Sequence, residues 1–393
     1  MASPRFVSGR TIDSLDGIRG LAIALVLLAH YSGSFPDVSE GISAAKVVAS
    51  YGWAGVDLFF ALSGFLITGI LLDTSDAPNY FRSFYVRRVL RIFPLYYLTL
   101  AAVLVGFSFV HPYPAELPLP EDRKLYFVYL TNWVGLWKGA WGENYLGHLW
   151  SLAVEEQFYF VWPLCIWFVR PTMLRKTLIT GGLFLALGVR VLWLHQTGVT
   201  PALRLATITR MDGLLVGALC ALLFRQRISS FLARSLPWFA VTLWAVFGVA
   251  VFLLRAMPEK VDAFVCTIGF TLLALAFGAL ILSAAVTDGE RTPLQRLLCA
   301  GPLKTLGKYS YGIYIFHVPV LGVSVLYMRS HGFVPYGVFL IFNLVTTFLI
   351  SAISYEYFER RILALKHYFQ PAPAPEPSME FARPGSRRVC PVK

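Results

Sequence analysis

Charged residues are scarce in this chain of 393 residues. Asp, Glu, Lys and Arg together account for 14% of it, whereas hydrophobic types account for 57% and the mean hydropathy is +0.63. A soluble domain usually contains about a quarter charged residues. One soluble core cannot bury so much apolar surface, so the composition excludes an ordinary soluble protein and indicates that lipid surrounds part of the chain.

Paired cysteines and internal repeats are also lacking. The sequence contains no repeat of the kind found in many transporters. The spacing of the cysteines favours neither a disulfide framework nor a metal site, so no bound metal ion is expected. The five cysteines are Cys165, Cys220, Cys266, Cys299 and Cys390.

Long apolar segments are abundant, and ten of them are long enough to cross a bilayer. The first resembles the hydrophobic part of a signal peptide, but it carries Asp16, Arg19 and His30, for which a cleaved signal has no use. We therefore predict an all-α, polytopic membrane helix bundle of about ten transmembrane helices. The segments lie at roughly 18–35, 54–72, 92–110, 149–169, 177–194, 206–224, 236–254, 264–286, 309–328 and 336–358.

Basic residues give the chain a net charge of +12 and also indicate its orientation. With a cytoplasmic N-terminus, 24 of the 34 Lys and Arg residues fall on the inner side of the ten spans and 8 on the outer side. This bias predicts that both termini are cytoplasmic, in the inner (plasma) membrane if the source is a bacterium. Because the basic residues occur in short runs between apolar segments, we expect no nucleic acid among the partners.

Three regions are expected along the chain. Residues 1–12 form a cytoplasmic tail, residues 13–362 form the transmembrane domain, and residues 363–393 form a Pro-rich, basic and disordered cytoplasmic tail. The longest outer loop, about 111–148, is rich in Pro, Trp and Tyr. This loop either covers an outer-facing site or forms an aromatic belt at the membrane surface.

Ionisable residues inside the spans are the main functional signal, because each costs about 2.5–3.5 kcal/mol on insertion scales and so needs a partner or a purpose. Arg19 and His30 lie eleven positions apart, which places them on one helix face about 16 Å apart along the axis. His30 is either a reacting group or a polar residue that bonds across helices. Its shared face with Arg19 favours the first interpretation.

Further charged residues enter the spans from the outer side. Asp57 either anchors its helix at the interface or belongs to a polar site. Adjacent glutamates point about 100° apart on a helix, so at most one of Glu155 and Glu156 is expected to react. Arg190, Arg210 and Asp212 form either a structural salt-bridge network or one polar cluster with His30.

Two polar groups lie elsewhere. Arg88 and Arg91 share a helix face on the inner side, which suits a multiply charged anion but also follows from topology alone. Ser310, Tyr314 and His317 are spaced i, i+4, i+7 and therefore share a face. They line a tunnel or form a hydrogen-bonded packing stripe.

Taken together, these motifs resemble the acyltransferase 3 family of membrane O-acyltransferases, which modify O-antigen, peptidoglycan, exopolysaccharides and some antibiotics. They occur in the family's order and cover about residues 13–362. The matching stretches are Leu15–Ala22 with the Arg19 to His30 spacing, Gly55–Phe65, Arg88 with Arg91, Trp150–Tyr159, Arg210–Asp212, and Tyr309–Tyr311 with His317.

The resemblance implies an enzyme that transfers acyl groups other than amino-acyl groups. It implies acyl-CoA, expected to be acetyl-CoA, as a donor substrate from the cytoplasm, with no permanently bound cofactor. The acceptor is a hydroxyl of a carbohydrate, a lipid-linked glycan or a small molecule. Arg88 and Arg91, together with Arg19, would hold the CoA phosphates.

Acyl transfer needs a base for the acceptor hydroxyl and stabilisation of an oxyanion. His30 is the natural base because its ordinary pKa lies near neutrality, and Arg210 is a candidate for stabilising negative charge. We prefer direct transfer, since no Ser or Cys accompanies His30 in its motif. The acids that could orient His30 are Asp57, Glu155 and Glu156, and the other residues expected to line the site are Asp16, Asp212, Tyr314 and His317.

A transporter or flippase is the alternative, with the intramembrane histidine and carboxylates relaying protons. The cytoplasmic arginine pair and the shared face of Arg19 and His30 suit a nucleotide-bearing donor better than a proton relay.

Overall fold

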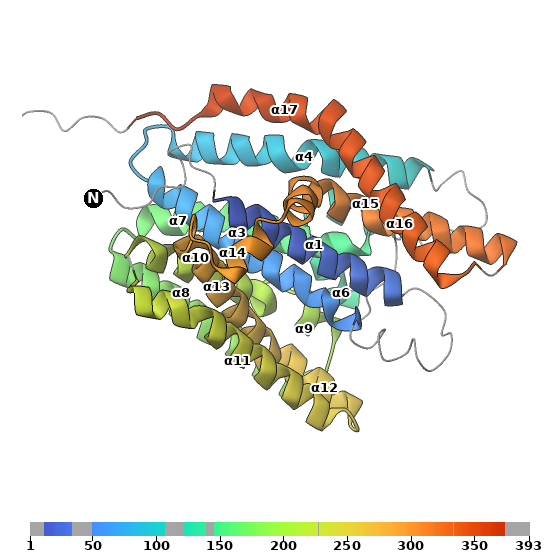
Figure 1. Cartoon of the computed structure of the whole chain (residues 1–393), viewed down its shortest axis with the longest axis horizontal. Helices are drawn as coiled ribbons and strands as arrows, with labels where there is room; N and C mark the ends of the chain where they lie inside the picture. Colours follow the sequence, from blue (N-terminus) through green and yellow to red (C-terminus); the bar gives the residue numbers. More distant parts are fainter. Residues whose placement is uncertain are drawn as a thin grey trace, which may run out of the picture.

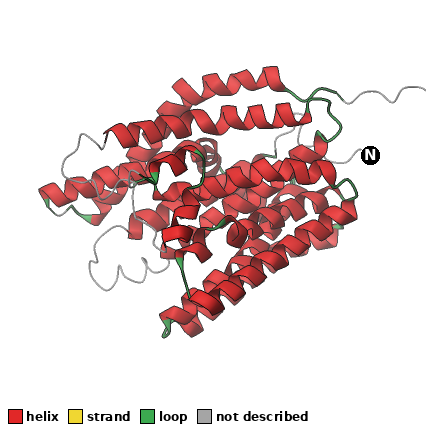
Figure 2. Ribbon diagram, turned by 180° about the vertical axis from the view of Figure 1, so that it is seen from behind, coloured by secondary structure: helices red, strands yellow, loops and turns green. Residues whose placement is uncertain are grey.

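The computed structural model describes residues 12–33, 49–106, 121–138, 145–226, 228–332 and 334–373. Across these ranges the chain forms helices joined by short loops and contains no strand (Figure 2). Nine helical stretches in the described residues are long and apolar enough to cross a membrane. The predicted all-α, polytopic membrane bundle is therefore confirmed.

The elements follow the predicted segments closely (Figure 1). Several spans consist of consecutive helical pieces that run on from one another. The nine stretches contain α1 (Asp13–Gly33), η1 with α3 (Tyr51–Trp53, Ala54–Asp73), α4 (Tyr80–Gly106), α8 (Thr172–Thr197), α9 with α10 (Pro201–Leu205, Thr207–Arg225), α11 (Ser230–Leu254), α12 with η6 and α13 (Pro258–Phe264, Val265–Gly269, Phe270–Val286), α15 (Gly301–His331), and α16 with η7, α17 and η8 (Tyr336–Ser354, Tyr355–Glu359, Arg360–Ala364, Leu365–Phe369).

The predicted segment 149–169 forms a further long helix, α7 (Trp150–Phe168), which is not among the nine. Its run of Glu155, Glu156 and Gln157 lowers its hydropathy. Contacts beyond its two ends tie α7 to other parts of the bundle. Arg170 is paired at 3.0 Å with Asp76, between α3 and α4, whereas His148, just before α7, packs against His317 near the middle of α15. Within the described residues nine stretches thus have the length and hydropathy of a membrane span, against about ten expected, and α7 occupies the position of the other predicted segment.

Two helices begin earlier than predicted. α4 starts at Tyr80 and not near residue 92, so Arg88 and Arg91 lie inside the helix and not in a segment before it. α15 likewise starts at Gly301, eight residues before the predicted boundary. Hydropathy marks the apolar part of a helix, and it misses turns whose long basic side chains reach toward water or a pocket.

The predicted boundary at residue 362 is corrected as well. Helical structure continues through α17 and η8 to Phe369, so the first part of the expected disordered tail is folded. Residues 374–393 lie outside the described residues, as does most of the expected N-terminal tail.

Close packing in the core depends on glycines from the sequence motifs. α1 packs against α15, and α3 packs against α10. A Cβ at Gly20 would collide with the backbone carbonyl of Leu303, and one at Gly64 with that of Leu214. Small residues let helix backbones approach in membranes, where burial away from water supplies no driving force between helices.

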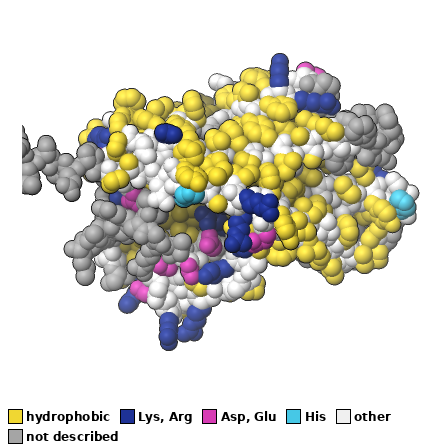
Figure 3. Space-filling view, turned by 90° about the horizontal axis from the view of Figure 1, so that it is seen from above, with side chains coloured by type: hydrophobic (Ala, Val, Ile, Leu, Met, Phe, Trp, Pro, Cys, Tyr) yellow, Lys and Arg dark blue, Asp and Glu magenta, His cyan; other side chains and the backbone are white. Residues whose placement is uncertain are grey.

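The periphery of the bundle is apolar. Large side chains on α8 and α11 face outward, including Phe184 at 71% exposure and Phe231 at 82%. Figure 3 shows hydrophobic side chains over most of one face, interrupted by a group of basic and acidic ones. Exposed apolar surface on this scale fits lipid as its environment, and the chain is an integral, multi-pass membrane protein.

Part of the long outer loop folds into the bundle as α5 (Arg123–Phe127), η4 (Thr131–Trp133) and α6 (Val134–Lys138). Gln157 of α7 donates hydrogen bonds to the Tyr129 carbonyl (2.8 Å) and to Asn132 Oδ1 (2.9 Å). Tyr129, at φ 54°, stacks on Phe93 and Tyr96 of α4. This part is therefore more than an aromatic belt at the surface, while residues 107–120 and 139–144 lie outside the described residues.

Candidate active site

A partly open pocket lies between α1, α3, α4, α7 and α15. One end contains Arg19, Arg88 and Arg91, and the other contains Ser151 and Tyr314. Glu155 and Tyr159 of α7 and Ser310 of α15 contribute to its wall, among apolar side chains of α3 and α4. The pocket therefore joins the predicted anion-binding residues to the predicted tunnel-lining face of α15.

The arginines at the basic end have different partners. Arg19 donates a hydrogen bond to Asp16, one turn earlier on α1, so Asp16 is the ion-pair partner of Arg19. Arg88 stacks at 5.7 Å on the ring of Tyr159, with its side chain only half-buried. No ion pair is found for Arg88 or Arg91 within the described residues, although the buried carboxyl of Glu359 lies in the electrostatic neighbourhood of Arg91.

The two adjacent glutamates face different cavities, as their 100° separation predicts. Glu155 lines the pocket described above, with the hydroxyls of Ser63 and Tyr159 within hydrogen-bonding reach. Glu156 lines a second, partly open cavity between α4 and α7, and its Oε1 has no hydrogen-bond partner among the described residues. Only Glu155 thus shares a cavity with all three arginines.

At the far end of the pocket, Tyr314 links the wall to a cluster of imidazoles. Its hydroxyl donates to the backbone carbonyl of His148 at 2.8 Å and also bonds the hydroxyl of Ser151. Its ring lies 5.4 Å from that of His317, measured between centroids. The ring of His317 lies in turn 4.8 Å from that of His30. His30 is therefore not part of the pocket wall and is connected to it through the ring of His317.

The hydrogen bonds of His30 and His317 fix their tautomers when the rings are neutral. Nδ1 of His30 lies 2.9 Å from the Val26 carbonyl, and Nδ1 of His317 lies 2.7 Å from the Tyr314 carbonyl. A carbonyl only accepts, so Nδ1 carries the hydrogen and the lone pair is on Nε2. In the described part of the chain a backbone carbonyl, and not an acidic side chain, orients His30.

His148 is a site residue that the sequence analysis did not assign. Its ring packs edge-on to that of His317 at 4.9 Å, and the residue is buried. Neither ring nitrogen makes a well-formed hydrogen bond to a described residue, although the backbone of Ile315 lies near. Its position directly before the Trp150–Tyr159 motif was the available signal, since that motif starts a span beside the site.

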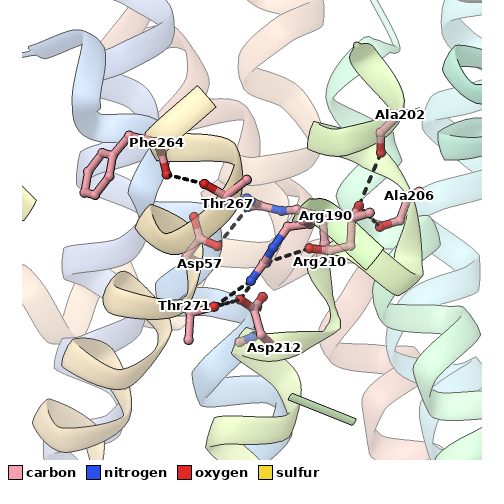
Figure 4. Close-up of polar contacts among 11 residues, drawn as sticks. Asp57, Arg190, Ala202, Ala206, Arg210, Asp212, Phe264, Thr267 and Thr271 are labelled. Atoms are coloured by element: carbon pink, nitrogen blue, oxygen red, sulfur yellow. Dashed lines mark hydrogen bonds and ion pairs between the residues drawn. The ribbon is translucent and has the colours of Figure 1, made fainter. Parts of the chain in front are cut away.

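Asp57, Arg190, Arg210 and Asp212 form a separate cluster of buried charges (Figure 4). Arg210 is paired with Asp57 at 2.8 Å, and Arg190 with Asp212 at 2.7 Å. The guanidinium of Arg210 also lies 3.7 Å from the ring centroid of Phe270 on α13. This geometry favours the structural-network interpretation of these residues, and the single cluster with His30 that we considered is not formed.

A metal centre is not indicated by the side chains present. No group of three or more His, Cys, Asp and Glu residues in the described ranges has a geometry that would hold a metal ion. The rings of His30 and His148 instead each pack edge to face with that of His317, as aromatic rings do.

A comparison of the sequence with models of known protein families agrees with the resemblance that the sequence motifs indicated. Residues 12–356 match the family model Acyl_transf_3, described as an acyltransferase domain. The chain therefore belongs to the acyltransferase 3 family.

Several curated relatives are similar over almost the whole chain. Peptidoglycan O-acetyltransferase OatA of Listeria monocytogenes is 29% identical over an alignment 371 residues long that covers 90% of this chain and 56% of the relative. O-acetyltransferase OatA of Staphylococcus aureus is 28% identical over an alignment, gaps included, 407 residues long that covers 98% of this chain and 61% of the relative. The putative peptidoglycan O-acetyltransferase YrhL of Bacillus subtilis is 29% identical over 373 residues, covering 90% and 55%.

This chain thus spans little more than half the length of the curated relatives that it matches. No solved structure is significantly similar to it.

Proposed function

We propose that this protein is a membrane O-acyltransferase that moves an acyl group, expected to be acetyl, from acyl-CoA to a hydroxyl of a carbohydrate. The observation that carries the proposal is the continuous pocket from Arg19, Arg88 and Arg91 to Tyr314, with the imidazoles connected to it through the ring of Tyr314. The names of the relatives, which are O-acetyltransferases and include peptidoglycan O-acetyltransferases, support a cell-wall glycan as acceptor.

The donor enters at the basic end. Guanidinium groups bind phosphates through charge-assisted, often bidentate hydrogen bonds, so Arg88 and Arg91 suit the phosphates of CoA. The pocket is lined by both basic and apolar side chains, which suits a donor with a charged head and a thin, less polar arm. The thin pantetheine arm extends along the wall formed by Glu155 and Tyr159 and carries the thioester toward Tyr314.

The base is His30, acting through the lone pair on Nε2. It accepts the proton of the acceptor hydroxyl as that oxygen attacks the thioester carbonyl carbon. The carbon–sulfur bond of the tetrahedral intermediate then breaks, and the departing thiolate of CoA receives the proton from His30. Acyl-CoA and alcohol are converted to ester and CoA thiol, so no further reactant is needed.

The oxyanion of the intermediate needs hydrogen-bond donors beside the reacting carbon. Arg210, considered at first, is paired with Asp57 in the separate cluster and does not line the pocket. The hydroxyls of Ser151 and Tyr314, which bond each other and the His148 carbonyl, line the pocket at the end beside the imidazoles and become the candidates in its place.

The test is thiol release from acetyl-CoA by the purified full chain in lipid nanodiscs, with soluble peptidoglycan fragments as acceptor. His30→Ala is expected to lower the rate about 10²–10⁴-fold, the usual contribution of a positioned general base. His195→Ala is the matched control, because His195 is exposed at the end of α8, far from the pocket. Equal acceptor-dependent thiol release by His30→Ala and by the wild type would refute the proposal, and so would acceptor-independent release by both.

A further inference from the structure

The C-terminal helical segment beyond the family match folds back along α4. The match ends at residue 356, whereas α17 and η8 continue to Phe369 and run beside α4 (Figure 1). Asn79, just before α4, fixes the end of this segment twice. Its Nδ2 donates to the Gln370 carbonyl at 2.9 Å, and its Oδ1 accepts from the Ala372 amide at 2.8 Å.

A cation–π contact fixes the segment at one further point. The guanidinium of Arg82 lies 5.7 Å from the ring centroid of Phe369. Because η8 and the first turns of α4 run in opposite directions, residues before Phe369 lie beside residues after Arg82. This register brings Lys366 alongside the turn that contains Arg87 and Arg88.

Lys366 does not line the pocket itself, but it lies in the electrostatic neighbourhood of the arginines at the basic end. The side chain is half-buried, and the charged groups that act on it most strongly are four arginines, namely Arg91, Arg88, Arg87 and Arg19. Three of these arginines line the basic end of the pocket. The segment thus adds a fifth cation where four are already gathered.

Such a gathering of like charges is unfavourable for folding alone, because each cation repels the others in a partly buried setting. None of the acids near these arginines is among the groups that act most strongly on Lys366: Asp16 pairs with Arg19, Glu359 acts on Arg91, and Glu155 and Glu156 act on Arg88. A lysine that contributes only to stability would be placed beside a carboxylate, as Lys308 is beside Glu356 at 2.6 Å. Lys366 instead lies where a bound anion with several negative charges would offset its repulsion by the arginines.

We propose that Lys366 completes the phosphate-binding site for the acyl-CoA donor, and that the segment from α17 to η8 serves as a fixed strap that holds it there. This inference rests on the proposed function, because it takes the phosphates of CoA as the anion. It assigns a binding role to a part of the chain that lies outside the matched domain. The phosphate of an anionic lipid has the same chemistry and is the rival occupant.

The experiment compares two donors, acetyl-CoA and S-acetylpantetheine, which has the same thioester but no phosphate. Lys366→Met is expected to raise the KM for acetyl-CoA about tenfold, equivalent to the loss of one charge-assisted contact. The kcat and the KM for S-acetylpantetheine should not change. Lys366→Arg should retain most of the affinity, and Arg361→Met, which removes an exposed cation from α17, should behave as the wild type.

Three results would overturn the inference. The first is an unchanged KM for acetyl-CoA in Lys366→Met. The second is an equal rise of KM for both donors, which would indicate a merely structural role. The third is an effect seen in nanodiscs of anionic phosphatidylglycerol but abolished in those of zwitterionic phosphatidylcholine, which would assign Lys366 to a lipid headgroup.

Direct binding of CoA to the wild type separates this inference from the proposed function. A wild-type protein that neither binds CoA, as measured by a shift in Tm, nor releases thiol from acetyl-CoA refutes the proposed donor, and the role of Lys366 with it. A wild type that does both, with Lys366→Met indistinguishable from it, refutes the role of Lys366 alone.

Discussion

Two sets of charged residues lie within the same helix bundle, and they differ in how their charges are satisfied. In the set formed by α3, α8 and α10, each arginine has a carboxylate at 2.7–2.8 Å and is almost fully buried. In the set around the pocket, Arg88 and Arg91 form no ion pair within the described residues and face empty space. The comparison teaches that charge inside a membrane protein indicates a ligand site when it faces a cavity, and fold stability when it faces a partner.

The largest effect is expected on folding stability, when an ion pair is removed from the set formed by α3, α8 and α10. Arg190→Met leaves Asp212 as an uncompensated buried charge, which should cost about 3–5 kcal/mol of folding stability. The yield of monodisperse protein and its Tm in detergent measure this loss. Arg204→Met, which removes an exposed ion pair with Asp262, is the matched control and should change little. Similar Tm values for the two variants would show that the buried pair contributes no more than the exposed one.

An intermediate effect is expected when an arginine of the set around the pocket is replaced. This change should affect binding of the donor and not folding stability. Arg88→Gln should keep the Tm of the wild type while raising the KM for acetyl-CoA about tenfold or more. The rise should shrink at high salt, because screening weakens the wild-type contact. Arg255→Gln, at an exposed position at the end of α11, controls for loss of charge alone. A fall in Tm without a change in KM would show that Arg88 stabilises the fold, as the arginines of α8 and α10 do, and does not bind the donor.

The smallest effect should distinguish the two glutamates. Glu155→Gln is expected to lower kcat/KM for acetyl-CoA about tenfold, because Glu155 lines the pocket beside Ser63 and Tyr159. Glu156→Gln should reduce it much less, since that side chain faces the second cavity between α4 and α7. Both variants keep size and remove one charge, so each serves as the control for the other. A larger loss of kcat/KM in Glu156→Gln than in Glu155→Gln would assign the chemistry to the second cavity.

Much of the fold could be predicted because hydropathy reports directly on what a helix does in lipid. Each of the ten predicted apolar segments coincides with a long helical stretch, nine of which, among the described residues, have the length and hydropathy of a membrane span. The glycines of the motifs lie where helix backbones meet. The errors occur where polar residues belong to a helix. α4 includes Arg88 and Arg91, and the last span continues to Phe369, because these residues face the pocket or the neighbouring helix.

The sequence predicted which residues belong to the candidate site better than it predicted which of them contact one another. Helical spacing identified the shared face of Ser310, Tyr314 and His317, since i, i+4 and i+7 fix directions on one helix. Spacing cannot tell which helices meet. Asp57 was therefore considered as a partner of His30, whereas it is paired with Arg210. His148 was overlooked because it lies in a short helical turn, where no periodicity applies.

The polar character of α7 has a consequence for how the protein is made. Two adjacent carboxyl groups lie within the first two turns of α7, and carboxyl groups inside a span are costly in lipid, so α7 is expected to partition less readily by itself than the other spans. Ser63 of α3 and Arg88 of α4, which lie beside Glu155, are synthesised before it. We therefore expect the earlier helices to provide a local polar environment that assists the entry of α7 into the bilayer.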